Sequence, residues 1–376
     1  EAEVGARGLA IVRAGRPVRS ATIRDVAKRS GVSVASVSRV LNGADTVTDA
    51  MRGRVLEAID TLHYVPHSGA RSLSTRRTDT LGVILPDLFG EYFSELIRGM
   101  DRAARAHGKH LIVSSSHDDA EEVALAMRSM RGRVDGLIVL SPHLDAARLA
   151  EGLVGSLPVV LMNAAAVGAD RPCIVVDNDG GAAQAVAHLV QTGRRRIAHV
   201  RGPLGNLEAD ERVQGYLRAL GDAGLGSRVE QGDFTQASGY RAVARMLAEP
   251  SPPDAVFAAN DMMAVGAVLA IQEARLRCPE DVAVVGFDDV PIAELVRPAL
   301  TTLRIDIAGT GARALERLIT LIQAPATGAW PESGREIVRP ALVVRQSSVA
   351  LQHQPERVTP RPEGRDQNLR GESHHA

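Results

Sequence analysis

The sequence predicts an α/β protein in which a three-helix head with a helix-turn-helix precedes a larger two-lobed core built on parallel sheets. Three observations predict this arrangement. Residues 21–43 show two short helical patterns joined by a glycine turn, whereas the chain after Thr80 alternates apolar runs with helical periods. The chain also has 376 residues and is 45% hydrophobic, which is enough for two or three folding units.

The first helix of the head has clear start and stop signals. Thr22 is followed three residues later by Asp25, the spacing of a capping box, which occupies otherwise unpaired N–H groups. Gly31 supplies the left-handed conformation that ends a helix. The small Ala27 stands where the first and second helices would cross closely.

The second helix is expected to begin after Ser33, which is suited to cap it. Its spacing directs Val37, Val40 and Leu41 inward. The outward residues are short or apolar apart from one arginine: Val34, Ala35, Ser36, Ser38 and Arg39. Such a face fits a DNA major groove, where methyl groups contact thymine and a guanidinium contacts guanine. An ordinary helical hairpin is the alternative.

A third helix capped by Thr48 has apolar residues at helical spacing and completes a head over residues 21–66. Residues 67–79 are expected to form a linker and a short hinge helix, since 70–73 are helix-compatible but too few to be stable alone. This segment is either a plain linker or folds only against a partner copy and DNA. Residues 1–20 are expected to be a disordered arm.

Composition favours a soluble cytoplasmic protein with one basic end. The formal net charge is −1, but residues 1–80 hold thirteen Arg or Lys against eight Asp or Glu, which leaves −6 for the remainder. A basic front module is expected of a protein that presents one end to phosphates. Cys173 and Cys278 are far apart and do not suggest a disulfide framework. No apolar run reaches membrane-spanning length, and residues 1–19 lack a secretion-signal pattern.

The core, over residues 80–348, shows two sets of buried-strand patterns separated by helices. The first set has strands at 80–85, 110–115, 136–141 and 159–162, with helices near 93–107, 120–129 and 146–152. The second has strands at 197–200, 255–259 and 282–287, with helices near 180–192, 209–223, 238–247 and 261–274. Two similar sets predict two lobes. Ligands of such sheets bind at the carboxyl ends of the strands, so an interlobe cleft is the expected ligand site.

Polar residues follow several of these strands and are therefore the candidates for ligand contact. Asp288, Asn260 and Asn163 each follow an apolar run, and Arg212 lies in the first turns of the helix after residues 197–200. Asp261 follows Asn260 directly. Each residue taken alone is more often a cap or turn residue than a ligand contact.

Three strings in order, VAKRSGVSVASVSRVLNG, YVPHSGARSL and LGVILPD, closely resemble the lactose-repressor (LacI) family of bacterial transcription regulators, and the likeness runs from about Thr22 to Ser348. The resemblance implies a homodimeric, ligand-responsive repressor of a pseudo-palindromic operator, with a core like that of periplasmic sugar-binding proteins. It also implies that the segment containing Ala70, Arg71 and Leu73 is a hinge helix whose leucine wedges into the minor groove. The expected DNA-binding residues are Thr22, Ser33, Val34, Ala35, Ser36, Ser38, Arg39, Asn42, Ala70, Arg71 and Leu73.

The resemblance also implies roles in the cleft. Arg212 and Asp288 match residues that hydrogen-bond ligand hydroxyls, with Asn260 and Asn163 as weaker matches. The apolar matches are Phe93 and Phe234, which would stack on a sugar or base face, while Tyr92 adds a hydroxyl. Asn206 stands near where a purine-binding member has a purine-contacting arginine, which disfavours a purine. A sugar is the favoured effector.

Other functions stay open with less support. The core alone would permit a solute-binding protein of a sugar importer, and an activator or a corepressed regulator with a purine-like effector is a further alternative. No GK[ST] phosphate loop, GxGxxG after a strand, HExxH or CxxC occurs, so we expect no enzyme and no cofactor. The acidic run after His117 is explained by a helix dipole better than by a metal. The tail at 349–376 lacks a heptad and is expected to be disordered, which favours a dimer.

Overall fold

The computed structural model describes residues 21–41, 43, 46–65, 77–117, 119–142, 157–164, 171–324 and 334–349. The chain divides into two compact units with the boundary between Asp79 and Thr80. The expectations for the arm at 1–20, the hinge helix at 70–73, the helix near 146–152 and the tail from 350 onward lie outside the described residues. Within the described part, no helix is long and apolar enough to cross a membrane.

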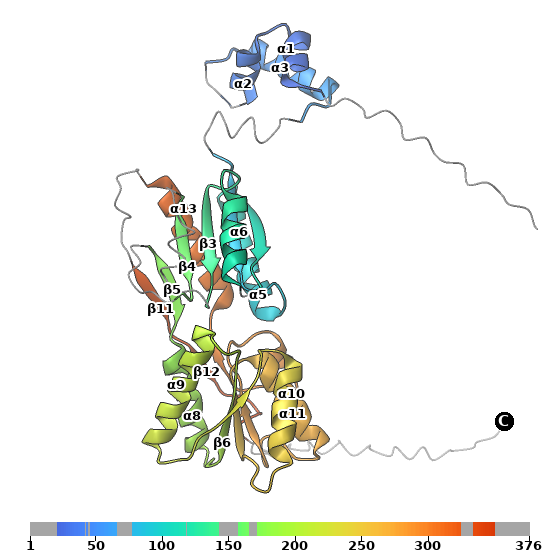
Figure 1. Ribbon diagram of the computed structural model, residues 1–376. Coiled ribbons are helices and arrows are strands. Elements are labelled where there is room, and N and C mark those ends of the chain that lie inside the picture. Colours follow the sequence, from blue (N-terminus) through green and yellow to red (C-terminus); the bar gives the residue numbers. More distant parts are fainter. Residues whose placement is uncertain are drawn as a thin grey trace, which may run out of the picture. The chain divides into compact units, whose positions relative to one another are not determined.

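The first unit is a three-helix head: α1 (Ile23–Ser30), α2 (Val34–Leu41) and α3 (Asp49–Thr61) (Figure 1). The capping box of α1 is confirmed, because Thr22 and Asp25 bond each other's backbone N–H reciprocally. Gly31 ends α1 at φ 68°, as expected. One valine from each helix is fully buried, so the three helices share one small core: Val26, Val37 and Val55.

The second unit has two lobes. The first lobe consists of a six-stranded parallel sheet and the helices that cover it. Its strand order is β11-β5-β4-β3-β1-β2. Alternate residues of β1 enter different hydrophobic clusters on the two faces, which is why its sequence is apolar throughout. Helices α5 and α13 cover one face and α6 the other. The bounds are β1 (Thr80–Leu85), α5 (Glu91–Ala106), β2 (His110–Ser115), α6 (Ala120–Met130), β3 (Gly136–Leu140), β4 (Val159–Met162), β5 (Cys173–Val176), α13 (Ile307–Gln323) and β11 (Arg335–Val338).

The second lobe holds a four-stranded parallel sheet of order β7-β6-β8-β9, with α8 and α9 packed together and α10 and α11 packed together. A short antiparallel pair, β10 with β12, lies beside it. The bounds are α8 (Asn178–Gln191), β6 (Ile197–Arg201), α9 (Leu207–Asp222), β7 (Arg228–Gln231), α10 (Gln236–Leu247), β8 (Ala255–Ala258), α11 (Asp261–Glu273), β9 (Ala283–Val285), α12 (Ile292–Leu295), β10 (Thr302–Arg304) and β12 (Ala341–Val343).

The lobes are not consecutive halves of the chain. The chain passes between them after β5, after β10 and after β11, so that α13 and β11 return to the first lobe (Figure 1). The α/β class with parallel sheets is confirmed, but the sequence reasoning missed five strands (β5, β7, β10, β11 and β12) and two helices (α12 and α13). The missed strands are three or four residues long, and β7 and β11 alternate between half-buried and exposed residues instead of reading as apolar runs.

Helix α13 packs closely against α5 at Gly99, which has no Cβ. A Cβ on Gly99 would overlap the backbone of Ala308. We therefore expect Gly99→Ala to lower the free energy of unfolding by about 1–3 kcal/mol or more, because the neighbour is backbone and cannot rotate away. Urea unfolding followed by circular dichroism measures this change.

Gly221→Ala in α9 is the matched control, because a Cβ there meets nothing within 4 Å. It should leave stability unchanged or raise it by up to about 1 kcal/mol through helix propensity. Equal stabilities for the two variants would contradict the close approach of α5 and α13.

Candidate functional site

The head presents one exposed face of α2, whose side chains are short apart from that of Arg39. Val34 is 41% exposed, and Ala35 and Arg39 are also exposed, while Val37 and Val40 on the opposite face are buried. Ser36 and Ser38 are half-buried. The structure thus confirms that α2 has one exposed face and one buried apolar face.

The expected caps hold this helix in place. The Ser33 hydroxyl accepts the Ser36 N–H at 3.1 Å, which satisfies a donor at the start of α2. Thr22 uses its hydroxyl within the capping box of α1. Four other residues expected to bind DNA lie outside the described residues: Asn42, Ala70, Arg71 and Leu73. A helix whose outward side chains are short apart from one arginine has the shape and chemistry to enter a major groove.

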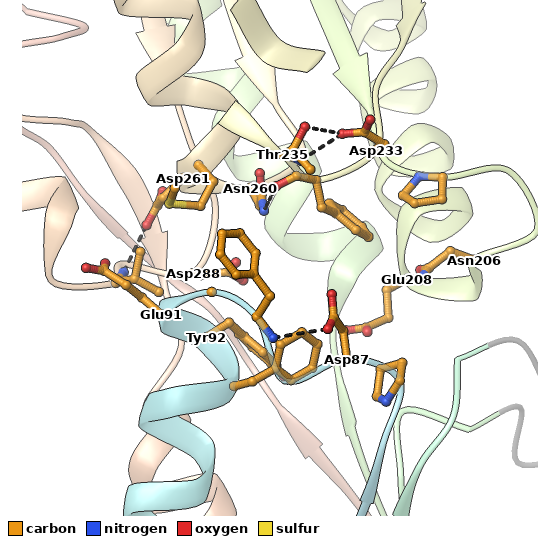
Figure 2. Close-up of a pocket in the computed structure, with 18 of the residues that line it drawn as sticks. Asp87, Glu91, Tyr92, Asn206, Glu208, Asp233, Thr235, Asn260, Asp261 and Asp288 are labelled. Carbon is orange, nitrogen blue, oxygen red and sulfur yellow. Dashed lines mark hydrogen bonds between the residues drawn. The ribbon is translucent and has the colours of Figure 1, made fainter. Parts of the chain in front are cut away.

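The core has a cavity of about 420 Å³ where the carboxyl ends of its two sheets face each other. Its size is within the range of small-molecule sites. Figure 2 shows Glu91 and Tyr92 reaching it from the first lobe and Asp233, Thr235 and Asn260 from the second. Among the residues expected to bind the effector, those that line the cavity are Tyr92, Phe93, Arg212, Phe234, Asn260 and Asp288.

Arg212 is the centre of the cavity wall and is only 4% exposed. Its Nε donates to Asn178 Oδ1 at 2.9 Å and its Nη1 donates to the Ala259 carbonyl at 2.5 Å. The guanidinium also lies 3.9 Å from the centroid of the Phe287 ring. These contacts fix the guanidinium plane, and its Nη2 lies 3.9 Å from Asp288 Oδ1 and 3.7 Å from Glu208 Oε1.

The backbone of Asp288 is fixed by a hydrogen bond, but one oxygen of its carboxylate has no hydrogen-bond donor. It adopts φ 111°, and its N–H donates to the Leu303 carbonyl at 2.8 Å. Its Oδ1 is buried and has no hydrogen-bond partner. Burial raises the pKa of this carboxyl from 3.8 to about 7; the positive charge of Arg212 lowers it and the negative charge of Glu208 raises it. A buried acceptor without a donor is expected where a ligand donates.

Glu208 is the main residue that the sequence analysis missed. It lies one turn before Arg212 in α9, and its Oε1 accepts the amide of Asn163 at 3.0 Å. Asn163 does not itself line the cavity but lies behind this wall, where it also bonds Tyr92. Burial, followed by the charges of Glu208 and Asp288, raises the pKa of Tyr92. The i,i+4 spacing of Glu208 and Arg212 on one helix face was the available sequence signal.

Asn260 and Phe234 support each other at the cavity wall. Asn260 caps α11 by accepting the Met263 N–H at 2.9 Å, and its amide donates to the Phe234 carbonyl at 3.0 Å. That bond holds Phe234 at φ 67°, a backbone conformation uncommon for an aromatic residue. Phe93 faces the same cavity and makes an edge contact with Tyr92. Aromatic rings therefore line the cavity from both lobes.

Three other polar residues that the sequence analysis discussed have structural hydrogen-bond partners. Asp261 is fully buried and accepts the Val290 N–H and the Thr302 hydroxyl, so it joins α11 to the segment before α12 and to β10. Asn206 caps α9 by accepting the Ala209 N–H at 3.0 Å. In the acidic run after His117, Asp119 caps α6 by accepting two N–H groups, in agreement with the helix-terminus explanation.

Two family models match the chain. Residues 22–67 match bacterial regulatory proteins of the lacI family, and residues 186–348 match a periplasmic binding protein-like domain. The first match covers the head and the second covers most of the second lobe together with α13 and β11.

Relatives match over most of their length. The HTH-type transcriptional repressor PurR of Erwinia tasmaniensis is 38% identical over 87% of this chain and 96% of the repressor. The ribose operon repressor of Escherichia coli K12 is 35% identical over 81% and 94%. A crystal structure of the lac repressor dimer bound to operator and the anti-inducer ONPF is 30% identical, covers 88% of this chain and 100% of that chain, and has a TM-score of 0.78.

The raised pKa of Asp288 predicts a pH dependence of stability. The folded-state pKa of about 7 lies above the ordinary 3.8, so between these values the folded protein holds a proton that the unfolded chain has released. The contribution of Asp288 to the free energy of unfolding should therefore fall as pH rises from about 4 to about 7 and level off beyond. Asp288→Asn should remove this contribution, while Glu208, Asp261 and Arg212 remain in both proteins. Urea unfolding of the two proteins across this range measures it, and a stability difference independent of pH would contradict it.

Proposed function

The chain belongs to the LacI family of bacterial regulatory proteins, and from that premise we propose that it is a transcriptional repressor whose operator affinity is set by a small molecule bound between the lobes. The observation that carries the proposal is the interlobe cavity, where a fixed guanidinium, an unsatisfied buried carboxylate and aromatic rings from both lobes meet. Such a cavity binds a ligand that both lobes must contact together.

We propose that the head reads DNA with the outward face of α2. Arg39 would contact base edges and the serines would contact phosphates, because phosphate contacts position a protein and base contacts specify a sequence. Two heads of a homodimer would then bind a pseudo-palindromic operator in the cytoplasm, with Leu73 of each chain wedged at its centre.

We propose a sugar as the effector. The rings of Phe93 and Phe234 offer apolar surfaces for the face of a sugar ring, and Arg212 and Asp288 offer a donor and an acceptor for its hydroxyls. A purine stays the second candidate because both rings would also stack on a base. The protein acts by binding, not by catalysis, and the DNA-binding head distinguishes it from a solute-binding protein of an importer.

The DNA contact of α2 is tested by removing one charge. Arg39→Ala should weaken binding of the full chain to its operator by about 1–3 kcal/mol and relax its preference at one base pair. Arg54→Ala removes the same charge from an exposed position on α3 and is the matched control. Fluorescence anisotropy with operator and mismatched duplexes measures both. Equal losses in the two variants, or an unchanged preference, would mean that Arg39 reads no base.

The effector contact is tested by changing the shape of the cation. Arg212→Lys keeps the charge but loses the planar fork that bonds Asn178 and Ala259, so the response of operator binding to the effector should fall at least about tenfold. Arg218→Lys, exposed on the same helix, should respond as the wild type does. The effector is first identified by thermal-shift screening of sugars and nucleobases. A normal response from Arg212→Lys would place the effector elsewhere.

A further inference from the structure

The charges that line the interlobe cavity are strongly unbalanced. Among the described residues, six carboxylates line it against a single cation, Arg212, and no lysine or histidine does. The six are Asp87, Glu91, Glu208, Asp233, Asp261 and Asp288. Figure 2 shows these acidic side chains distributed around the cavity. The imbalance does not by itself name a ligand, because most of these groups have partners.

Five of the six carboxylates accept hydrogen bonds from nearby protein donors. Asp87 accepts the Leu88 N–H, Glu91 accepts the Ile292 N–H at 3.0 Å, Asp233 accepts from Thr235, and Asp261 accepts from Val290 and Thr302. These groups therefore shape the cavity and contribute a negative potential. Glu208 is the fifth, because it accepts the Asn163 amide at 3.0 Å, whereas Asp288 Oδ1 has no donor. These two carboxylates lie beside Arg212, where a ligand would meet them.

One guanidinium cannot satisfy both of these carboxylates. Arg212 uses Nε and Nη1 on Asn178 and the Ala259 carbonyl, and its Nη2 stands 3.7 Å and 3.9 Å from Glu208 and Asp288, beyond hydrogen-bond distance. Asp288 Oδ1 consequently has no hydrogen-bond donor, although its side chain is only 8% exposed. The centre of the cavity thus has one positive and two negative groups, and one acceptor, Asp288 Oδ1, has no donor.

The neighbouring amide does not fill this gap. Asn260 donates its amide to the Phe234 carbonyl, away from Asp288. The Asn163 amide donates to Glu208 from behind the wall. Acceptors therefore exceed donors at the point where a ligand would lie, and a ligand that brings donors and positive charge is favoured over one that brings acceptors and negative charge.

We propose that the effector of this chain is a hydroxyl-rich ring with a protonated amine, as in an amino sugar, and that its ammonium group lies between Asp288 and Glu208. The inference rests on the proposed function of the cavity and narrows its ligand class. An ammonium group would supply the missing donor to Asp288 Oδ1 and balance the second negative charge, with Phe93 and Phe234 against the ring faces. The raised pKa of Asp288 agrees, because without a cation this carboxyl retains a proton at a pH where carboxyls are ordinarily charged.

The same geometry excludes phosphorylated sugars. A phosphate group would bring negative charge and acceptor oxygens next to two carboxylates in a partly desolvated cavity, where like charges repel more strongly than in water. The guanidinium that would have to bind the phosphate already donates to the protein from two of its three nitrogens.

Calorimetric titration of the full chain with matched sugar sets tests the inference. Each set has one ring in four forms: the neutral hexose, its 2-amino form, the N-acetylated amine and the 6-phosphate, in the gluco, galacto and manno series. In the series that binds, the 2-amino form should bind at least about tenfold tighter than the neutral form, as expected for a charge-assisted contact. Its N-acetylated form, which has no charge, should lose this gain, and the 6-phosphate should not bind.

Variants separate the ammonium contact from general effects. Glu208→Gln keeps the shape and removes one charge, so the preference for the amine over the neutral sugar should fall by about tenfold. Asp210→Asn removes a charge from the same turn of α9 outside the cavity, where Asp210 pairs with Arg201, and should keep the full preference. An equal preference in Glu208→Gln and wild type would overturn the assignment.

The outcomes distinguish this inference from the function on which it rests. If neutral or phosphorylated sugars bind as tightly as the amines and alter operator binding, the repressor assignment stands and the amine inference is wrong. If no sugar of any charge binds and operator affinity does not respond, the proposed sugar effector is wrong, and with it the inference.

Discussion

The buried guanidinium of Arg212 joins the parts of the second lobe that form the cavity. From α9 it bonds Asn178 at the start of α8 and the Ala259 carbonyl after β8, and it packs on the Phe287 ring after β9. Without it, a buried amide and a buried carbonyl would lose their donors and two carboxylates their counter-charge, each at a cost of about 1–3 kcal/mol or more. The geometry of the cavity wall therefore depends on a charge that is largely withdrawn from water.

Most of the strands that are buried on both faces could be predicted from the sequence, although β5, which is equally buried, was missed. Strands β1, β3, β4 and β8 read as continuous apolar runs because helices cover each side of their sheets. The edge strands β7 and β11 could not be recognised, since half of their residues face solvent. The return of α13 to the first lobe could not be predicted either, because the Gly99–Ala308 contact joins segments far apart in the sequence.

The site could be predicted in part, because some of its residues directly follow strands that the sequence reveals. Asp288 and Asn260 follow buried strands, so the strand-end rule identified them. The rule also selected Asn163, but its φ of 49° and its bond to Glu208 place its amide behind the wall, and no local pattern encodes that direction. Likewise, the net charge of −6 on residues 81–376 suggested only solubility. The fold places six of the carboxylates in this part of the chain around one cavity.

The three passages of the chain between the lobes limit how the cavity opens. Beside one of them, the backbone of Asp288 bonds Leu303 and Ile305, just before the chain enters α13. Three short connections resist translation of the lobes past each other but permit bending about a line through them. A ligand bound at Asp288, as proposed, would lie close to that axis, so a small displacement there would correspond to a larger movement at the far ends of the lobes.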